Sequence, residues 1–472
     1  MTISLVVLLW LGLSGCTMVP QYTRPAAPVP AAWPSGPAYK ETAAAPGAAI
    51  TADLKWREFF TDEQLQKIIE TALNHNRDLR LAALQVERAR ALYRVQRTEL
   101  LPRVETNVIA SKQRVRISGQ SGLATIEEYG VNLGVSAWEI DFFGRIRSLS
   151  KKALEEFFAT EHARRSAQIL LVSEVANAYL TLAADRENLK LAQSTLESQQ
   201  AAYHIIQRRF KVGLTPELDL RQAQTRVDAA RVDVARYTQL SAQDENALNL
   251  LAGTPVPADL LPGELTVVKP LPDVSPGTSS VVLLQRPDIL QAEHQLKAAN
   301  ANIGAARAAF FPRISLTTAT GTASGDLSGL FKSGSFVWSY APQIVLPIFD
   351  ARTWSALKVT KVDREIAVAQ YEKAIQGAFK EVADALATKG TLGEQIAAQQ
   401  SLVEASAKTY KLSSARYEKG IDIYLNVLDA QRSLYSAQQG LIAIRLAKLA
   451  NQVRLYAVLG GGSDSSTPPA GG

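Results

Sequence analysis

The sequence carries an internal duplication that limits how the chain can fold. The stretch Leu100–Thr106 (LLPRVET) returns as Phe310–Leu316 (FFPRISL), and the two prolines are 312 − 102 = 210 residues apart. A second pair of matching positions, Gly213 and Gly420, is 420 − 213 = 207 residues apart. Intervals this long indicate a duplicated structural unit, and the three-residue difference fits a deletion in a surface loop.

Each copy predicts the same order of elements: a helix, a β-hairpin, a long helix, a turn and a second helix. Proline cannot continue a helix and favours extended backbone before it, so Pro102 and Pro312 mark where a helix gives way to a strand. The first repeat is predicted over residues 61–253, with a hairpin at about 103–141 and a turn at Gly213. The second is predicted over residues 280–460, with a hairpin at about 313–349 and a turn at Gly420. Residues 254–279 are predicted to link the repeats, and residues 461–472 to form a disordered tail.

The hairpin segments alternate between apolar residues and small or polar ones. In the first hairpin, one side carries Tyr129, Val131, Leu133 and Val135, and the other carries Gly130, Asn132, Gly134 and Ser136. This pattern is typical of barrel strands that face lipid, although a strand of a soluble sandwich looks similar.

Aromatic residues near the predicted strands are expected to form girdles at the membrane interfaces, or else to belong to a sandwich core. They are Trp138, Phe336, Trp338 and Tyr340. Pro342, which interrupts the second strand pattern of the second hairpin, predicts a bulge or a strand end.

Four strands are too few to close a barrel, because small closed barrels begin at about eight strands. An open sheet in lipid would leave the backbone groups of its edges unpaired, at a cost of several kcal/mol each. Apart from the N-terminal run, we expect no segment to reach the ~18 apolar residues of a membrane-spanning helix. The chain is therefore expected to share a barrel with other copies, and three chains would supply about twelve strands. Strand counting alone leaves dimers and tetramers open.

The N-terminus has the pattern of a bacterial lipoprotein. Residues 1–15 form an apolar run of signal-peptide length, and Leu13–Cys16 (LSGC) resembles a lipobox, in which the cysteine becomes lipidated. Thr17 after the cysteine favours sorting to the outer membrane, by the same resemblance. Residues 16–60, rich in Pro and Ala, are predicted to be an extended tether rather than part of a core.

Composition argues against several functions. Lys and Arg exceed Asp and Glu by 51 − 45 = 6 without a basic tract, so nucleic-acid binding is not expected. Four histidines, a single cysteine and the lack of a Gly-rich phosphate loop predict neither an enzyme nor a metal or cofactor site.

Several motifs, in this order and spacing, resemble the outer-membrane factor (TolC-like) family, specifically the lipoprotein branch that serves resistance-nodulation-division multidrug pumps. They are Cys16–Pro25 (CTMVPQYTRP), Trp56–Leu65 (WREFFTDEQL), Asn76–Leu79 (NRDL), Glu139–Arg145 (EIDFFGR), Leu346–Arg352 (LPIFDAR) and Leu428–Leu434 (LDAQRSL).

The resemblance implies a mixed α/β membrane protein that forms a homotrimer. Each chain would supply four strands to a shared 12-stranded outer-membrane β-barrel, which a long periplasmic α-helical barrel continues. Such a protein conducts drugs or other small molecules from a periplasmic adaptor and an inner-membrane pump to the exterior. Its barrel contacts outer-membrane lipid, and its periplasmic tip is gated.

The resemblance also points to site residues at the two predicted turns. Val212, Gly213, Leu214 and Thr215 resemble the tip motif that meets the adaptor, and Gly420 marks the second turn. Leu425 and Asp429, four residues apart on one helix face, match the family's constriction positions. The simpler interpretation is that the glycines only permit tight turns and that Asp429 is an ordinary solvated or ion-paired carboxylate.

Other functions remain possible from the sequence. One alternative is an exit duct for type I protein secretion or for metal-ion efflux. A different class is a lipid-anchored coiled-coil scaffold that forms no pore, in which the strand segments would lie on a soluble surface.

Overall fold

The computed structural model describes residues 17–40, 54–116, 123–269, 271–273, 277 and 279–461. The predicted signal peptide, Cys16 and the predicted tail after residue 461 lie outside this part of the chain. The chain divides into two compact units, each formed from both repeats. The strand unit comprises residues 1–26, 85–161 and 291–371, and the tip unit comprises residues 27–84, 162–290 and 372–472.

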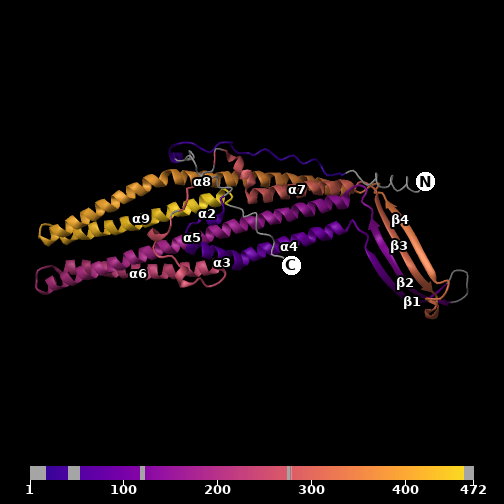
Figure 1. Cartoon of the computed structure of the whole chain (residues 1–472), viewed down its shortest axis with the longest axis horizontal. Helices are drawn as coiled ribbons and strands as arrows, with labels where there is room; N and C mark the ends of the chain where they lie inside the picture. Colours follow the sequence, from indigo (N-terminus) through magenta and orange to yellow (C-terminus); the bar gives the residue numbers. More distant parts are fainter. Residues whose placement is uncertain are drawn as a thin grey trace. The chain divides into compact units, whose positions relative to one another are not determined.

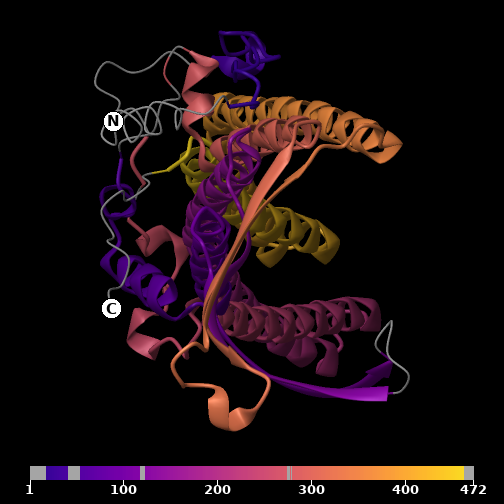
Figure 2. The ribbon, with the colours of Figure 1, turned by 90° about the vertical axis from the view of Figure 1, so that its right-hand side faces the viewer.

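The strand unit contains a four-stranded antiparallel sheet in the order β1-β2-β3-β4 (Figure 1). Its strands are β1 (Val104–Arg116), β2 (Leu123–Glu139), β3 (Arg313–Ser324) and β4 (Phe336–Val345). Both predicted hairpins are present, and pairing of β2 with β3 joins them, so β1 and β4 are the edges of the sheet. The sheet is strongly curved along its strands (Figure 2).

The pairing of β2 with β3 is interrupted by a bulge. Between Val135 and Trp138, β2 carries one residue more than β3, and Ala137 within this stretch has a φ of 47°. The expectation for Pro342 was wrong, because this proline lies inside β4 opposite Leu316, with regular pairing on both sides. As β4 is an edge strand, it is a position at which a sheet tolerates proline.

The helices follow the predicted order in both repeats. They are α2 (Trp56–Phe59), α3 (Glu63–His75), α4 (Arg77–Thr98), α5 (Arg145–Lys211), α6 (Glu217–Ala252), α7 (Pro287–Ala308), α8 (Ala351–Glu418) and α9 (Tyr424–Val458). Short 3₁₀ turns are η1 (Pro37–Tyr39), η3 (Ala258–Leu260), η4 (Leu265–Val267), η5 (Ser280–Gln285) and η6 (Leu327–Gly329). With 67 and 68 residues, α5 and α8 are each about 100 Å long.

One stretch of α5 is apolar and long enough to cross a membrane by composition alone, which the sequence prediction did not anticipate. More than half of that 18-residue stretch is buried inside the protein. Burial of this kind is typical of a core helix, and Val175, Ala176 and Tyr179 are almost fully buried within α5.

An aspartate caps the start of both long helices. Asp141 accepts hydrogen bonds from the backbone N–H groups of Ile146 and Arg147, at 3.1 and 2.9 Å. Asp350 accepts one from the backbone N–H of Arg352 at 2.9 Å. These carboxylates satisfy N–H groups that have no partner inside the helix and that favour negative charge.

The helices before the two hairpins are anchored in equivalent ways within the tip unit. The Asn76 side chain donates to the carbonyl of Leu251 at 3.0 Å, and the Arg286 side chain donates to the carbonyl of Val458 at 2.6 Å. The intervals are 286 − 76 = 210 and 458 − 251 = 207 residues, so the duplication extends to these contacts. Asn76 also divides the single helix predicted before the first hairpin into two, α3 and α4.

The predicted tether, residues 16–60, is extended at first but is not free of the core. In the strand unit, Arg24 forms an ion pair with Glu293, whose side chain is only 4 % exposed, and Asn300 donates to the carbonyl of Pro20 at 2.8 Å. Glycine is required at position 304, where a Cβ atom would lie 2.5 Å from Val19 Cγ2.

The later part of the predicted tether, residues 27–40 and 54–60, belongs to the tip unit and is also packed against helices, so the prediction of a loose tether was wrong there too. The Trp33 ring stacks on Phe379 with their centroids 5.3 Å apart, and Ser280 donates to the carbonyl of Ala31. Trp56 and Phe59 are buried, and Phe59 stacks on Tyr456 at 4.2 Å. Pro and Ala composition suggested a loose segment, but its few aromatic side chains bind it to the helices.

Candidate functional site

Two helix turns at the same end of the tip unit hold the residues that the sequence singled out (Figure 1). The first turn joins α5 to α6, and the second joins α8 to α9. Each has a glycine in the left-handed region, Gly213 with φ 75° and Gly420 with φ 73°. The N–H of Leu214 bonds to the carbonyl of Arg209, and the N–H of Ile421 to that of Arg416, both at 2.9 Å. Both turns are therefore Schellman motifs, in which glycine avoids the strain that a Cβ atom would bring.

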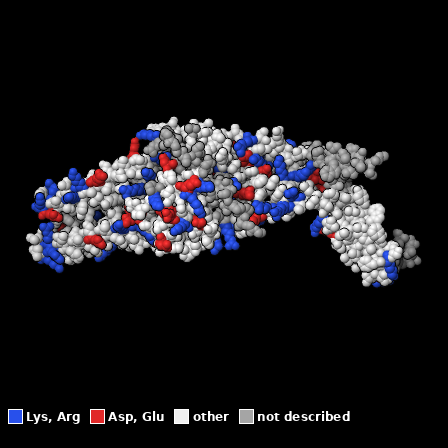
Figure 3. Space-filling model, in the orientation of Figure 1, with Lys and Arg blue, Asp and Glu red and all other residues white. Residues whose placement is uncertain are grey.

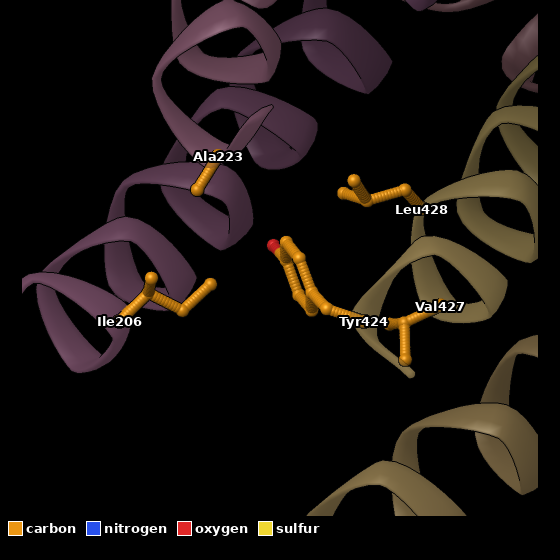
Figure 4. Packing of buried hydrophobic residues seen from close by; sticks show 5 residues of the cluster. All are labelled: Ile206, Ala223, Tyr424, Val427 and Leu428. Carbon is orange, nitrogen blue, oxygen red and sulfur yellow. The ribbon is translucent and has the colours of Figure 1, made fainter. Parts of the chain in front are cut away.

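An apolar cluster holds the two helical hairpins together just behind the turns. Its buried members are Ile206, Ala223, Tyr424, Val427 and Leu428 (Figure 4). The Tyr424 ring projects from α9 toward Ile206 of α5 and Ala223 of α6. Burial, followed by the influence of Tyr417 and Tyr410, raises the pKa of Tyr424 to about 12, so its hydroxyl stays neutral.

The two turns have the same backbone but present different side chains. In the first turn, Val212 is 68 % exposed, Leu214 is 75 % exposed, and the Thr215 hydroxyl donates to Asp219 at 2.8 Å. In the second turn, Arg416 forms an ion pair with Asp422, and this bond lowers the pKa of the Asp422 carboxyl. Ile421 and Ile423 of the second turn are also exposed, at 58 and 64 %, so both turns offer apolar surface and only the second carries an ion pair.

Leu425 and Asp429 lie on the exposed face of α9, whereas Tyr424, Val427 and Leu428 face the cluster. The Leu425 side chain is 45 % exposed. The Asp429 carboxylate forms an ion pair with Arg432 at 3.0 Å, one turn further along the same helix. Sequence reasoning missed Arg432, although spacing of three residues on a helix is enough to suggest this pair.

Basic side chains also gather at the turns (Figure 3). The last turn of α5 carries Arg208, Arg209 and Lys211, and Lys419 lies in the second turn. The Arg209 guanidinium lies 5.6 Å from the centre of the Tyr417 ring, so it also links the two hairpins. A separate groove of about 810 Å³ in the tip unit is lined by α5, α8, α9 and Arg286, away from the predicted tip and gate residues.

In the strand unit, the register places the apolar positions of the four strands on one face. Val108 pairs with Val131, Val131 with Thr322, and Thr322 with Phe336. Six apolar residues of this face are between 51 and 72 % exposed in the single chain: Val108, Leu133, Phe336, Trp338, Tyr340 and Ile344. The view in Figure 3 shows few charged side chains over the strands. An exposed apolar surface of this kind needs a nonaqueous neighbour.

Comparison with known proteins agrees with this arrangement. The profile of the family described as outer membrane efflux protein matches residues 68–254 and 278–461. The toluene efflux pump outer membrane protein TtgC of Pseudomonas putida is 50 % identical over 456 residues, covering 95 % of this chain and 93 % of TtgC. The antibiotic efflux pump outer membrane protein ArpC of the same species has the same identity and coverage. The open-state MtrE outer membrane channel of Neisseria gonorrhoeae has a similar structure, with a TM-score of 0.84, 38 % identity and coverage of 95 % of this chain and 98 % of MtrE.

Proposed function

Because the chain belongs to the outer membrane efflux protein family, we propose that it forms, as a homotrimer, the outer-membrane channel of a tripartite efflux pump. Its cargo is apolar or amphiphilic small molecules, since relatives of equal similarity are named for toluene and for antibiotics. A periplasmic adaptor and an inner-membrane pump deliver the cargo, and the channel itself performs no chemistry.

One observation carries this proposal: among the described residues, the sheet has two edges without a neighbouring strand, β1 and β4, and an exposed apolar face. A lipid-facing sheet must pair its edges, and three copies closing into twelve strands would do so. The same face would remain uncovered in a soluble scaffold, so the channel is favoured over that alternative.

The test is single-channel recording of the purified protein in planar bilayers, together with efflux in a strain that lacks its own channel. We expect discrete conductance steps, and restored resistance to toluene and to an antibiotic. A protein that gives no conductance and stays soluble without detergent would support the scaffold. If the protein restores export of metal ions or of a secreted protein, but not resistance to toluene or the antibiotic, the result would support the metal-ion duct or the type I secretion duct instead.

The tip turns are proposed to receive the adaptor. The exposed Val212 and Leu214 would supply apolar contact area, Gly213 and Gly420 would let the turns approach closely, and Thr215 would be oriented by Asp219. The lipid anchor is proposed to be Cys16. It directly precedes residues 17–26, which dock on α7 through contacts such as that of Asn300 with Pro20.

Leu425 and Asp429 are proposed to narrow the channel near the tip, where threefold symmetry would repeat each side chain three times. The ion pair with Arg432 refines this proposal, because each carboxylate brings a compensating cation. We expect Asp429→Ala to raise conductance in the same bilayer recordings, since it removes both bulk and the bond that holds Arg432. Glu217→Ala, which breaks an exposed helix pair with Arg221 near the other turn, is the matched control. Equal conductance of Asp429→Ala and the unmodified channel would remove Asp429 from the gate.

A further inference from the structure

We propose that the seam between neighbouring chains of the barrel repeats the register of β2 and β3, so that Ser339 of one chain lies opposite Gln113 of the next. This inference rests on the trimeric barrel of the proposed function, and goes beyond it by fixing which residues meet at the seam. The occupant of each open edge is thus a second copy of this chain.

The first step is that the two hairpins are equivalent strand by strand. Val108 of β1 pairs with Val131 of β2, and Thr318 of β3 pairs with Tyr340 of β4. The offsets are 318 − 108 = 210 and 340 − 131 = 209 residues, and the first equals the interval between the duplicated prolines. In the second hairpin, β3 therefore takes the place of β1, and β4 takes the place of β2.

The second step transfers the one pairing that joins the hairpins. Val131 of β2 pairs with Thr322 of β3. If β4 meets the next chain's β1 as β2 meets β3, the corresponding positions are 131 + 209 = 340 and 322 − 210 = 112. Tyr340 is then opposite Lys112 of the next chain, and antiparallel order places Ser339 opposite Gln113 and Ala341 opposite Ser111.

The side chains give an independent check on this register. The exposed aromatic residues Phe336, Trp338 and Tyr340 alternate along β4. Along β1, the register places Arg116, Arg114 and Lys112 of the next chain opposite them, in that order. Lys112 also forms an ion pair with Glu127 of its own chain. Arg114 and Arg116 have no ion pair among the described residues, and a guanidinium beside an aromatic ring is a favourable contact.

Other registers match these side chains less well. A slip by one residue would place the apolar face of β4 beside the opposite face of β1. A slip by two residues in either direction leaves one of the three aromatic rings without a cation and one of the three cations without a ring. The proposed register alone pairs all three.

Four cysteine positions on the other face of the sheet test the register. The in-register pairs are Gln113→Cys with Ser339→Cys, and Ser111→Cys with Ala341→Cys. Exchanging partners gives two mismatched pairs, Ser111→Cys with Ser339→Cys and Gln113→Cys with Ala341→Cys, from the same four cysteines. Opposed residues on neighbouring strands can form a disulfide, whereas diagonal ones lie too far apart without backbone movement.

The readout is the rate at which covalent trimers form in the outer membrane under mild oxidation, on a non-reducing gel after heat denaturation. Because β1 and β4 are opposite edges of one sheet, such trimers report contacts between chains. We expect both in-register pairs to cross-link at least about tenfold faster than both mismatched pairs. The register is overturned if either mismatched pair cross-links faster than the in-register pairs. It is also overturned if none of the four pairs cross-links.

Conductance separates this outcome from failure of the proposed function. A variant that conducts but cross-links through a mismatched pair overturns the register and leaves the channel standing. A protein that neither conducts nor forms trimers overturns the channel itself.

Discussion

The smallest features with a measurable consequence are the glycines of the two tip turns. A Cβ atom added at Gly213 or Gly420 would meet no atom within 4 Å, so the only cost of alanine there is backbone strain. Left-handed backbone costs an L-residue about 1–2 kcal/mol. Within one chain, glycine is therefore favoured at both positions by backbone conformation and not by lack of space.

We expect Gly213→Ala to weaken the turn by about 1 kcal/mol, because its φ is 75°. Hydrogen exchange of the amides in residues 209–217 should become about fivefold faster. Gly377→Ala is the matched control: it lies inside α8 with open space around it, so alanine should stabilise that helix by about 0.5–1 kcal/mol. Slower exchange in both variants would show that the first turn does not need its left-handed residue.

A second residue-scale feature is a carboxyl pair between α5 and α6. Burial, followed by repulsion from Asp185, raises the pKa of Asp244 to about 6. Burial also raises the pKa of Asp185, against the influence of Asn188 and Arg236. A proton shared by this pair would give a partner to Asp244 Oδ2, which is buried and has no hydrogen bond among the described residues.

The sign of the pH dependence follows from the raised pKa. The folded protein holds this proton more tightly than the unfolded chain, so the stabilisation is complete below about pH 4 and is lost as pH rises through about 6. Allowing for solvent, we expect a loss of about 1 kcal/mol per chain. Asp244→Asn should remove this dependence and raise the melting temperature at pH 7.5 by about 2 °C. Asp228→Asn, on an exposed carboxylate of the same helix, should leave the pH profile unchanged. Identical profiles for both variants would contradict the assignment.

Sequence reasoning reached the residues of the tip only in part. Glycine at the end of a helical pattern is enough to place both turns, and helical spacing is enough to place Leu425 and Asp429 on one face. The exposure of Val212 and Leu214, and the burial of Tyr424 beside Ile206, depend on packing between helices more than 200 residues apart, which spacing within one helix cannot reveal.

At the scale of elements, residues 17–26 belong to the strand unit because they dock on α7. Glu293 is buried, which raises the pKa of its carboxyl, but bonds from Arg24 and Lys297 outweigh burial and lower the pKa overall. Loss of Arg24 would leave a buried carboxylate with only part of its compensation, which is costly.

We expect Arg24→Gln to destabilise the docked segment by about 1 kcal/mol, since the Arg24 side chain itself is 45 % exposed. Limited proteolysis within residues 17–30 should become several times faster. Lys40→Gln, which removes an exposed pair with Glu394, is the control and should have little effect. Equal protection of both variants would show that Arg24 does not hold the segment.

The elements themselves were largely predictable. The long helix expected between the first hairpin and the turn at Gly213 is α5 at residues 145–211, because its periodicity is unbroken and a glycine ends it. The break at Asn76 was missed because its cause is a contact with Leu251, 175 residues away. The docking of residues 17–40 and the regular pairing of Pro342 were missed for the same reason, since both depend on neighbours distant in sequence.

At the scale of the whole molecule, the duplication makes a single chain a fraction of a closed structure. Two hairpins supply four strands, and their pairing leaves one β1 edge and one β4 edge. In the described part of one chain, neither the apolar face nor the two edges have a partner, and both gain one when copies close around an axis.

The stagger of the strands sets the bore of that closed structure. In the proposed seam register, the path from Val108 through its paired residues Val131, Thr322 and Phe336 ends at Arg116 of the next chain. It advances 116 − 108 = 8 residues, or 24 for three chains. With twelve strands about 4.8 Å apart and about 3.4 Å per residue, this shear inclines the strands by about 55° and gives a diameter of about 30 Å. At that slant, the 13 residues of β1 rise only about 25 Å, which is the height of the apolar band of an outer-membrane barrel. In this register, the length of β1 follows from the inclination of the strands, and so does a wide barrel.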